Sequence, residues 1–389
     1  MKKTAYIGCL GLIGIITTEF GVIGILPQIA EHYRIPIEKA GWLLSAFAMV
    51  IALGGPAMTL LFSRVNRKLI MSLAIGMFIV TGVVSALAPP FWLLLTVRVL
   101  PAILHPVFVS TAIAAAIQAA PPKEATRMMG IVLGGIAIAM VTTVPFATWL
   151  AGRINWQAAF WAQSAISLTA LLAILIGLPQ IPKSEKESLG SQAAILRDPV
   201  FVTSSIVNVL LIAAWFCTYS YFADFLGKVK GMDEERISYM LMVFGLAGIP
   251  ANWIAGRLLG KQLSLTTAVF LAGALFIPFM SIAVGGGIVV NAVVLALWGF
   301  FYAPCYLTAA AYLTSAAPGA VAFANTLAIS YGNLGITVGT TVSGWVIARY
   351  GIAAAPWAGA AFGIAALVAM ALRSQLVARR AIRRSCVAP

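Results

Sequence analysis

Long runs of apolar residues, separated by short polar segments, form the dominant pattern of this chain. Each run is close to or above the roughly 20 residues that an α-helix needs to cross a bilayer, and the runs are too long and too apolar for transmembrane β-strands. The pattern predicts about twelve helical spans. They are residues 5–30, 40–62, 69–88, 92–117, 128–151 and 157–178, then 200–224, 237–258, 264–284, 288–312, 323–347 and 355–373.

The composition agrees with this pattern and assigns the class of protein. Hydrophobic residues make up 61% of the 389 residues and charged residues only 9%, whereas soluble domains carry about 25% charged residues. We therefore expect an all-α polytopic membrane protein. Its first span is too long for the core of a cleaved signal peptide and has no small-residue cleavage site after it, so we expect it to remain as a helix.

The net charge of +14 indicates orientation in the membrane rather than nucleic-acid binding. If the N-terminus is inside, 17 basic residues fall on the cytoplasmic side and 7 on the other, so both termini are expected in the cytoplasm. The basic segment Arg379–Arg384 has two interpretations: a determinant of topology or a contact with anionic lipid.

A polar segment near the middle divides the predicted spans into two sets of six. We expect an N-terminal six-helix bundle (1–178), a cytoplasmic linker (179–199), a C-terminal six-helix bundle (200–373) and a basic cytoplasmic tail (374–389). The sequence Gly-x-Pro-Ala occurs at 54–57 and again at 248–251, each time inside a predicted span and shortly before a basic turn. Related halves of this kind are typical of secondary transporters, whose substrate site lies between the halves.

Three motifs carry a resemblance to a known family. They are Thr17-Thr18-Glu19-Phe20 with Gly24-Ile25-Leu26-Pro27, Arg98 with Leu104-His105-Pro106 and Phe108, and Tyr219-Ser220-Tyr221-Phe222. Over nearly its whole length the chain resembles the 12-span drug:proton antiporters of the major facilitator superfamily, in the bacterial branch that exports sugars, chloramphenicol or purine nucleosides.

The resemblance implies a major facilitator fold of 12 transmembrane helices in two six-helix halves, placed in the bacterial cytoplasmic (inner) membrane. It also implies proton-coupled efflux of small organic molecules by alternating access. The sequence departs from the family pattern in two places. The loop 62–68 keeps its basic cluster without the usual Gly and Asp, and Val144 precedes Pro145 where a Gly-Pro pair is usual. Uptake or uncoupled facilitation of a small nutrient therefore remains the alternative.

Glu19 is the leading candidate for proton coupling. A charged carboxylate near the middle of a span costs at least roughly 3 kcal/mol, so such a group is usually functional. The alternative for Glu19 is a protonated acid that only joins helices by hydrogen bonds. Arg98 and His105, in the fourth span, lie seven residues apart and so on roughly the same helix face. The resemblance favours both as coupling residues. The alternatives are an Arg98 side chain that extends to the interface and a His105 that only packs.

A set of aromatic and amide side chains in the second half is predicted to line the substrate site. Trp215, Tyr219 and Phe222 share one helix face, and so do Trp298, Tyr302 and Tyr306; Asn325 and Asn333 add hydrogen-bonding groups in the eleventh span. Amphipathic aromatic walls suit drugs, sugars and nucleosides. Individual members could equally be packing residues or interface anchors. Asp224, at the end of the seventh span, is either an interface residue or a second acid.

Other classes of function find no support in the sequence. Motifs of metal-dependent, serine or nucleotide-dependent enzymes are absent, and two histidines with four scattered cysteines provide no metal-ligand spacing. We expect no enzyme activity, no metal and no cofactor. The expected partners are a small-molecule substrate, protons and the lipid bilayer, without nucleic acid, and a monomer is the default state. The substrate itself cannot be read from these residues.

Overall fold

The computed structural model describes residues 2–385 except 63–64, 122–123, 179–192 and 286. All regular secondary structure in this part of the chain is helical. Most of the proposed linker, residues 179–192, lies outside the described residues. The residues before and after that gap are called the first and second halves below.

The first half contains six predicted spans, several of them built from two or three consecutive helices. Its elements are α1 (Lys2–Gly21), η1 (Val22–Gly24), α2 (Leu26–Tyr33), α3 (Ile37–Ala40), α4 (Trp42–Leu61), α5 (Arg67–Ala86), α6 (Phe91–Val99), η2 (Leu100–Ile103), α7 (His105–Gln118), α8 (Ala125–Ile138), the π-helical η4 (Ala139–Thr143), α9 (Val144–Arg153) and α10 (Trp156–Gly177).

The second half repeats this plan. Its elements are η5 (Ala193–Arg197), α11 (Pro199–Tyr219), α12 (Phe222–Lys230), α13 (Glu234–Leu259), α14 (Leu263–Ala283), α15 (Ile288–Tyr302), α16 (Cys305–Ala316), α17 (Val321–Tyr350), η6 (Ile352–Ala354) and α18 (Ala355–Ser385). Pro56 lies inside α4 and Pro250 inside α13, so the repeated Gly-x-Pro-Ala sequence occupies the second span of each half. The last helix continues past residue 373 to Ser385 without a break.

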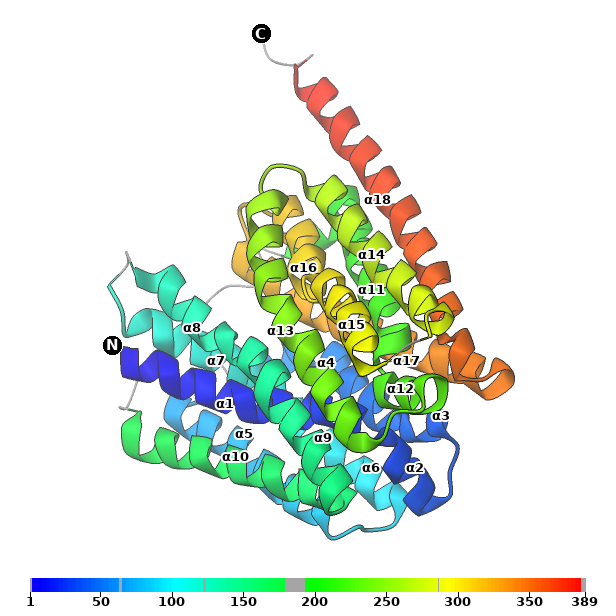
Figure 1. The fold of residues 1–389 in the computed structure, drawn as a ribbon. Helices are drawn as coiled ribbons and strands as arrows, with labels where there is room; N and C mark the ends of the chain where they lie inside the picture. Colours follow the sequence, from blue (N-terminus) through cyan, green and yellow to red (C-terminus); the bar gives the residue numbers. More distant parts are fainter. Residues whose placement is uncertain (1, 63–64, 122–123, 179–192, 286, 386–389) are drawn as a thin grey trace.

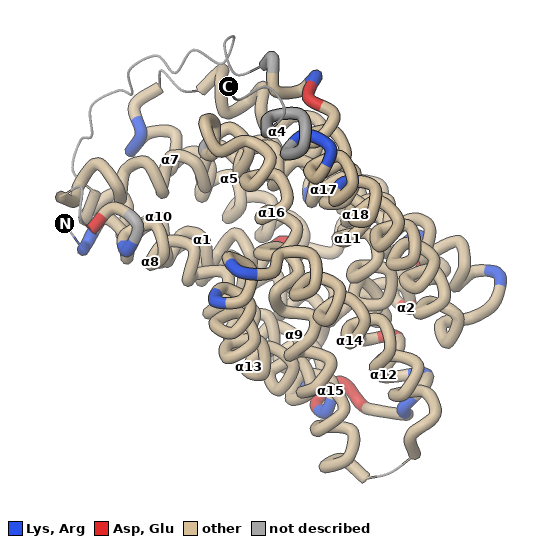
Figure 2. The backbone as a smooth tube through the Cα atoms, turned by 90° about the horizontal axis from the view of Figure 1, so that it is seen from above, with Lys and Arg blue, Asp and Glu red and all other residues tan. Residues whose placement is uncertain are grey.

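Eleven helical segments of the described residues are long and apolar enough to cross a membrane. The further long helix, α17, fills the place of the eleventh predicted span and contains polar residues such as Asn333, Thr337 and Thr340. Figure 2 shows charged residues mainly at helix ends and in connecting segments, with long uncharged stretches between them. The predicted all-α membrane fold is confirmed.

Several predicted spans are interrupted, the first and the seventh among them. The span 5–30 breaks after Gly21, and Pro27 lies in the first turn of the new helix α2, where its missing N–H is tolerated. The span 200–224 breaks after Tyr219. At that break the hydroxyl of Ser220 bonds that of Thr340 at 2.6 Å, so the interruption is anchored to α17.

Helix α1 is the central helix of the first half. In its apolar segment 89% of the residues are buried, against 28–67% in the other spans. Glycines allow this close packing: a Cβ on Gly14 would lie 2.9 Å from the hydroxyl oxygen of Ser167 in α10. The polar residues near its end, Thr17, Thr18 and Glu19, are therefore held inside protein rather than against lipid.

The two halves form a V in Figure 1, with α2, α3, α9 and α12 where they meet and the two termini toward its far ends. The end of the molecule at which α1 begins and α18 finishes is called the terminal face. Contacts between the halves occur toward the other end, where Arg153, the last residue of α9, pairs with Glu235 of α13 at 2.7 Å. The hydroxyl of Thr337 in α17 also donates to the carbonyl of Ser45 in α4 at 3.1 Å. The halves thus diverge toward the terminal face.

Candidate functional site

Glu19 and His105 form a buried pair in the first half. Glu19 lies in the last turn of α1, and His105 is the first residue of α7. His105 Nε2 lies 3.3 Å from Glu19 Oε2, and the two residues are only 5% and 3% exposed. The sequence predicted both residues as candidates, and the structure brings them into contact.

The broken fourth span positions His105. Pro101 lies in the 3₁₀ segment η2, and Pro106 occupies the first turn of α7. Prolines cannot continue the hydrogen-bond ladder of an α-helix, so the span is interrupted between them. His105 consequently starts a new helix, and its ring also lies with its edge toward Phe47 of α4, 6.3 Å between ring centroids.

Arg98 lies beside this pair. Among the described residues, its guanidinium forms no ion pair with the Glu19 carboxylate. Its Nη2 donates to the carbonyl oxygen of Thr18 at 3.0 Å, and its guanidinium lies 5.4 Å from the ring centroid of Phe160 in α10. The residue is 3% exposed, and its Nε and Nη1 have no hydrogen-bond partner in the described structure. A buried cation with free donors is available to bind a ligand, water or a rearranged carboxylate.

Gln163 is a neighbour that the sequence analysis missed. It is 1% exposed in the interior of α10, and neither its Oε1 nor its Nε2 has a partner among the described residues. A Cβ on Gly21 would lie 2.9 Å from its Nε2, so the amide lies against the end of α1. The only signal for it in the sequence is a lone amide inside an apolar span.

The predicted aromatic residues of the second half are mostly packed against each other. Tyr219 and Tyr302 have ring centroids 4.6 Å apart, and those of Phe222 and Trp298 are 5.4 Å apart. Phe244 of α13, which the sequence analysis did not select, contacts all four rings. This cluster is buried and forms part of the core of the second half.

The remaining predicted residues differ in their surroundings. Trp215 is 2% exposed and its indole nitrogen has no recorded partner within the described residues, whereas Tyr306 is 38% exposed. Asn333 is buried and its Nδ2 donates to the carbonyl of Ile329 at 3.0 Å, while its Oδ1 is unpartnered in the described part of the chain. Asn325 is exposed. Asn208 of α11, buried and with an unpartnered Oδ1 there, is an addition that the sequence analysis missed.

Phe216 connects the aromatic residues with the buried pair. Its ring lies 5.9 Å from that of Phe20, the residue after Glu19, and this contact crosses between the halves. Phe216 also lies 6.1 Å from both Tyr302 and Tyr306. The candidate coupling residues and the candidate substrate residues therefore meet at the boundary between the halves.

Asp224 does not join this group. It lies in α12, is 3% exposed and pairs with Lys228 one turn later, at 2.9 Å. The described residues also contain no group of three or more His, Cys, Asp or Glu side chains placed to hold a metal ion.

Two helical halves, a polar centre inside the first and an aromatic cluster beside it in the second define a polytopic membrane transporter. The chain matches the model of the Major Facilitator Superfamily over residues 8–339 and belongs to that superfamily. The predicted membership of this superfamily and the prediction that the protein is not an enzyme are thereby confirmed.

Two relatives with similar sequences are named as transporters. The chain is 28% identical over 345 residues, 87% of each sequence, to the inner membrane transport protein YdhP of Escherichia coli K12. It is 26% identical over 355 residues to a probable sugar efflux transporter of Helicobacter pylori strain 26695, with 90% of each sequence covered.

Two solved structures share the fold. The nucleoside transporter NupG has a TM-score of 0.76 at 13% identity, covering 96% of this chain and 99% of that one. A bacterial homologue of the human lysosomal transporter Spinster, in an inward-facing and occupied conformation, has a TM-score of 0.74 at 17% identity, covering 96% of both chains. These likenesses agree with the predicted twelve-helix fold.

Proposed function

We propose that this transporter exports small organic molecules, such as sugars, nucleosides or drugs, in exchange for protons across the bacterial cytoplasmic membrane. The buried Glu19–His105 pair is the observation that carries the proposal. Relatives named as an inner membrane transport protein and a probable sugar efflux transporter support the location and the direction. The proposed topology has both termini in the cytoplasm, and the six-helix bundles 1–178 and 200–373 act as the moving units.

Protonation of Glu19 is the proposed coupling step. When its carboxylate takes up a proton from outside, the attraction to His105 weakens and the contact between α1 and α7 loosens. Release of that proton toward the cytoplasm restores the charged carboxylate and the pair. Arg98 keeps its hydrogen bond to the carbonyl of Thr18, so it serves as a positioning residue that fixes the end of α1.

The proposed substrate site lies between the halves, around Phe216 and Tyr306. The exposed ring of Tyr306 supplies a stacking surface, and the unpartnered polar atoms of Trp215 and Asn208 supply a donor and an acceptor. Rings with adjacent hydrogen-bonding groups suit molecules that are flat or cyclic and carry hydroxyls. The names of the sugar and nucleoside transporters above agree with this chemistry.

The test of coupling is Glu19→Gln in everted membrane vesicles that contain the protein. With sugars, nucleosides and chloramphenicol-like drugs as probes, the unmodified protein should show substrate-induced proton movement. The variant should fall to the level of empty vesicles, because an amide cannot take up and release the proton. A pH-sensitive dye inside the vesicles measures this.

Glu31→Gln is the matched control, since it removes the same charge from an exposed position on α2 and should leave the signal intact. If Glu19→Gln transports with unchanged pH dependence, the coupling assignment is wrong. Counterflow of substrate without a pH gradient, equal in the variant and the unmodified protein, would instead support uncoupled facilitation.

A further inference from the structure

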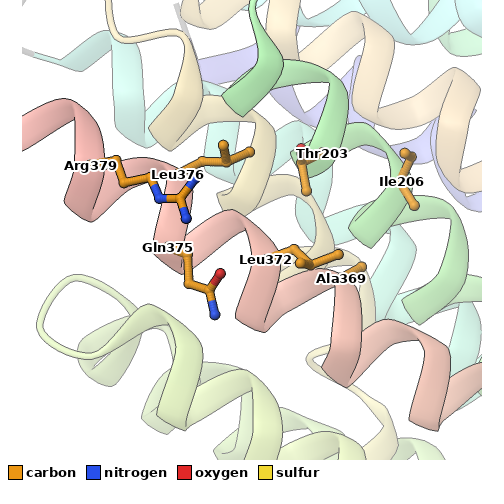
Figure 3. A pocket seen from close by; sticks show the side chains of 7 residues that line it. All are labelled: Thr203, Ile206, Ala369, Leu372, Gln375, Leu376 and Arg379. Atoms are coloured by element: carbon orange, nitrogen blue, oxygen red, sulfur yellow. The ribbon is translucent and has the colours of Figure 1, made fainter.

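A groove of about 330 Å³ lies between α11 and α18 (Figure 3), and none of the residues that line it belongs to the candidate transport site. This volume is at the low end of the range of small-molecule sites, about 300–1,000 Å³. It is lined by Thr203 and Ile206 of α11 and by Ala369, Leu372, Gln375, Leu376 and Arg379 of α18. Ile206 and Leu372 are 49% and 54% exposed, so the groove opens on the outside of the second half.

Apolar and charged side chains occupy different ends of the groove. Leu372, Leu376 and Arg379 follow each other at intervals of four and three residues and so share one face of α18. Figure 3 shows Arg379 at one end, with Ile206 and Leu372 toward the other. Arg379 is also nearly the last residue of the apolar span, which ends at Arg380. The apolar end is thus directed into the membrane and the cation toward its surface.

Arg379 is the cation that lines this groove. It forms no ion pair among the described residues. Its neighbour Arg380 pairs with Asp198, Nη2 to Oδ1 at 2.5 Å. Arg197 is also exposed at the same end of α11, and the sequence adds two more basic residues within the next turns of α18, Arg383 and Arg384. Basic clusters at the end of a membrane span attract anionic headgroups.

We propose that this groove binds one anionic phospholipid. Its phosphodiester lies against the Arg379 guanidinium, and the hydroxyl of Thr203 and the amide of Gln375 are available to the headgroup and glycerol oxygens. One acyl chain follows the apolar wall of Ile206 and Leu372. The unpaired cation, the apolar wall and the place at the end of a span together fit an amphiphilic anion, and a soluble anion would leave the apolar wall unused.

Native mass spectrometry of the full-length protein, purified in detergent, tests the proposal. The probes are phosphatidylglycerol and phosphatidylcholine with identical acyl chains, added in equal amounts. The unmodified protein should retain several-fold more phosphatidylglycerol than phosphatidylcholine. Arg379→Gln should reduce that excess at least about threefold, because it removes the cation without changing the apolar wall. Ile206→Ser should reduce the retention of both lipids.

Arg257→Gln provides the matched control, since Arg257 is an exposed arginine in the last turn of α13, also at the terminal face. This variant should keep the excess of phosphatidylglycerol. Unchanged thermal unfolding of all three variants verifies their folding. Equal retention of phosphatidylglycerol by the Arg379→Gln variant and the unmodified protein would overturn the proposal.

Discussion

At the scale of a single residue, Asp198 fixes the start of α11 through two hydrogen bonds. Its Oδ1 accepts a hydrogen bond from the backbone N–H of Val200 at 2.9 Å, which caps the helix, and one from Arg380 at 2.5 Å. The bond from Arg380 is the main cause that lowers the pKa of Asp198 below its ordinary value of 3.8, with partial burial opposing and the backbone bond to Val200 adding to it. The side chain therefore joins the beginning of the seventh span to the end of the twelfth.

This lowered pKa determines the direction of a pH effect. Because the carboxyl has a lower pKa when folded than when unfolded, its stabilisation is complete above the ordinary pKa and is lost as the pH falls through the folded pKa. Asp198→Ala should cost roughly 1–2 kcal/mol near neutral pH, since a cap and a partly exposed pair are both lost. Asp198→Asn should cost about 0.5 kcal/mol, since Asn still caps the helix.

Thermal unfolding of the purified variants, followed from about pH 5 to about pH 3, measures both effects. The difference between the unmodified protein and Asp198→Asn should shrink as the pH falls. A difference that stays constant over this range would show that the pair with Arg380 contributes nothing. Equal losses in the Asn and Ala variants would show that the helix cap contributes nothing.

At the scale of helices, glycine pairs four residues apart, such as Gly130 with Gly134 and Gly335 with Gly339, do not all serve close helix packing. Gly339 of α17 lies tightly on α11, since an added Cβ would be 2.5 Å from the carbonyl oxygen of Ala213. Gly134 of α8 has open space where its Cβ would be. The sequence gives the same small-xxx-small pattern at both places, so only the structure separates the packed glycine from the free one.

Gly339→Ala should therefore destabilise the second half by about 1–3 kcal/mol, the range of overpacked core substitutions. The methyl group would meet the backbone of α11, which cannot rotate away as a side chain can. Gly134→Ala, the matched control, should cause no loss, because alanine is the better helix former. Thermal unfolding and detergent-solubilised yield measure both, and an equal loss in the two variants would contradict the packing argument.

Most helices of this fold could be predicted from the sequence, because the bilayer imposes length and apolar character on every span. The predicted separation of spans nine and ten at Gly285–Gly287 agrees with α14 ending at Ala283 and α15 beginning at Ile288. The break after Tyr219 and the π-helical turn η4 could not be predicted. The break after Tyr219 is anchored by the bond between Ser220 and Thr340 of α17, and hydrophobic periodicity contains no record of such a contact.

At the scale of the whole molecule, the candidate site was only partly predictable for a related reason. Glu19 and His105 were selected because ionisable groups are rare in spans, and their contact at 3.3 Å joins α1 to α7. Gln163 and Phe244 were missed, since an amide or a phenyl ring in an apolar span is common. Their importance comes from neighbours on other helices. The predicted roles of the site residues stay predictions until transport is measured.

The arrangement of the halves also gives a test of alternating access. Arg153 and Glu235 join the halves at the end away from the terminal face, and their side chains are 55% and 36% exposed. A transporter that alternates must separate this contact in each cycle. Joining Arg153→Cys to Glu235→Cys with a short bifunctional thiosulfonate, which bonds to each thiol through a reducible disulfide and spans the reach of the ion pair, should abolish transport in vesicles.

The cross-link should act by trapping one state, and that mechanism can be separated from damage to the protein. Reduction of the cross-link should restore transport, because the halves are then free to move again. The control pair, Asp233→Cys with Arg236→Cys, replaces an ion pair of 3.6 Å at the start of the same helix α13. Cross-linking there ties residues of a single half together and should leave transport unchanged. Transport that continues after complete cross-linking between the halves would show that this end of the molecule does not open, and the alternating movement proposed here would then be wrong.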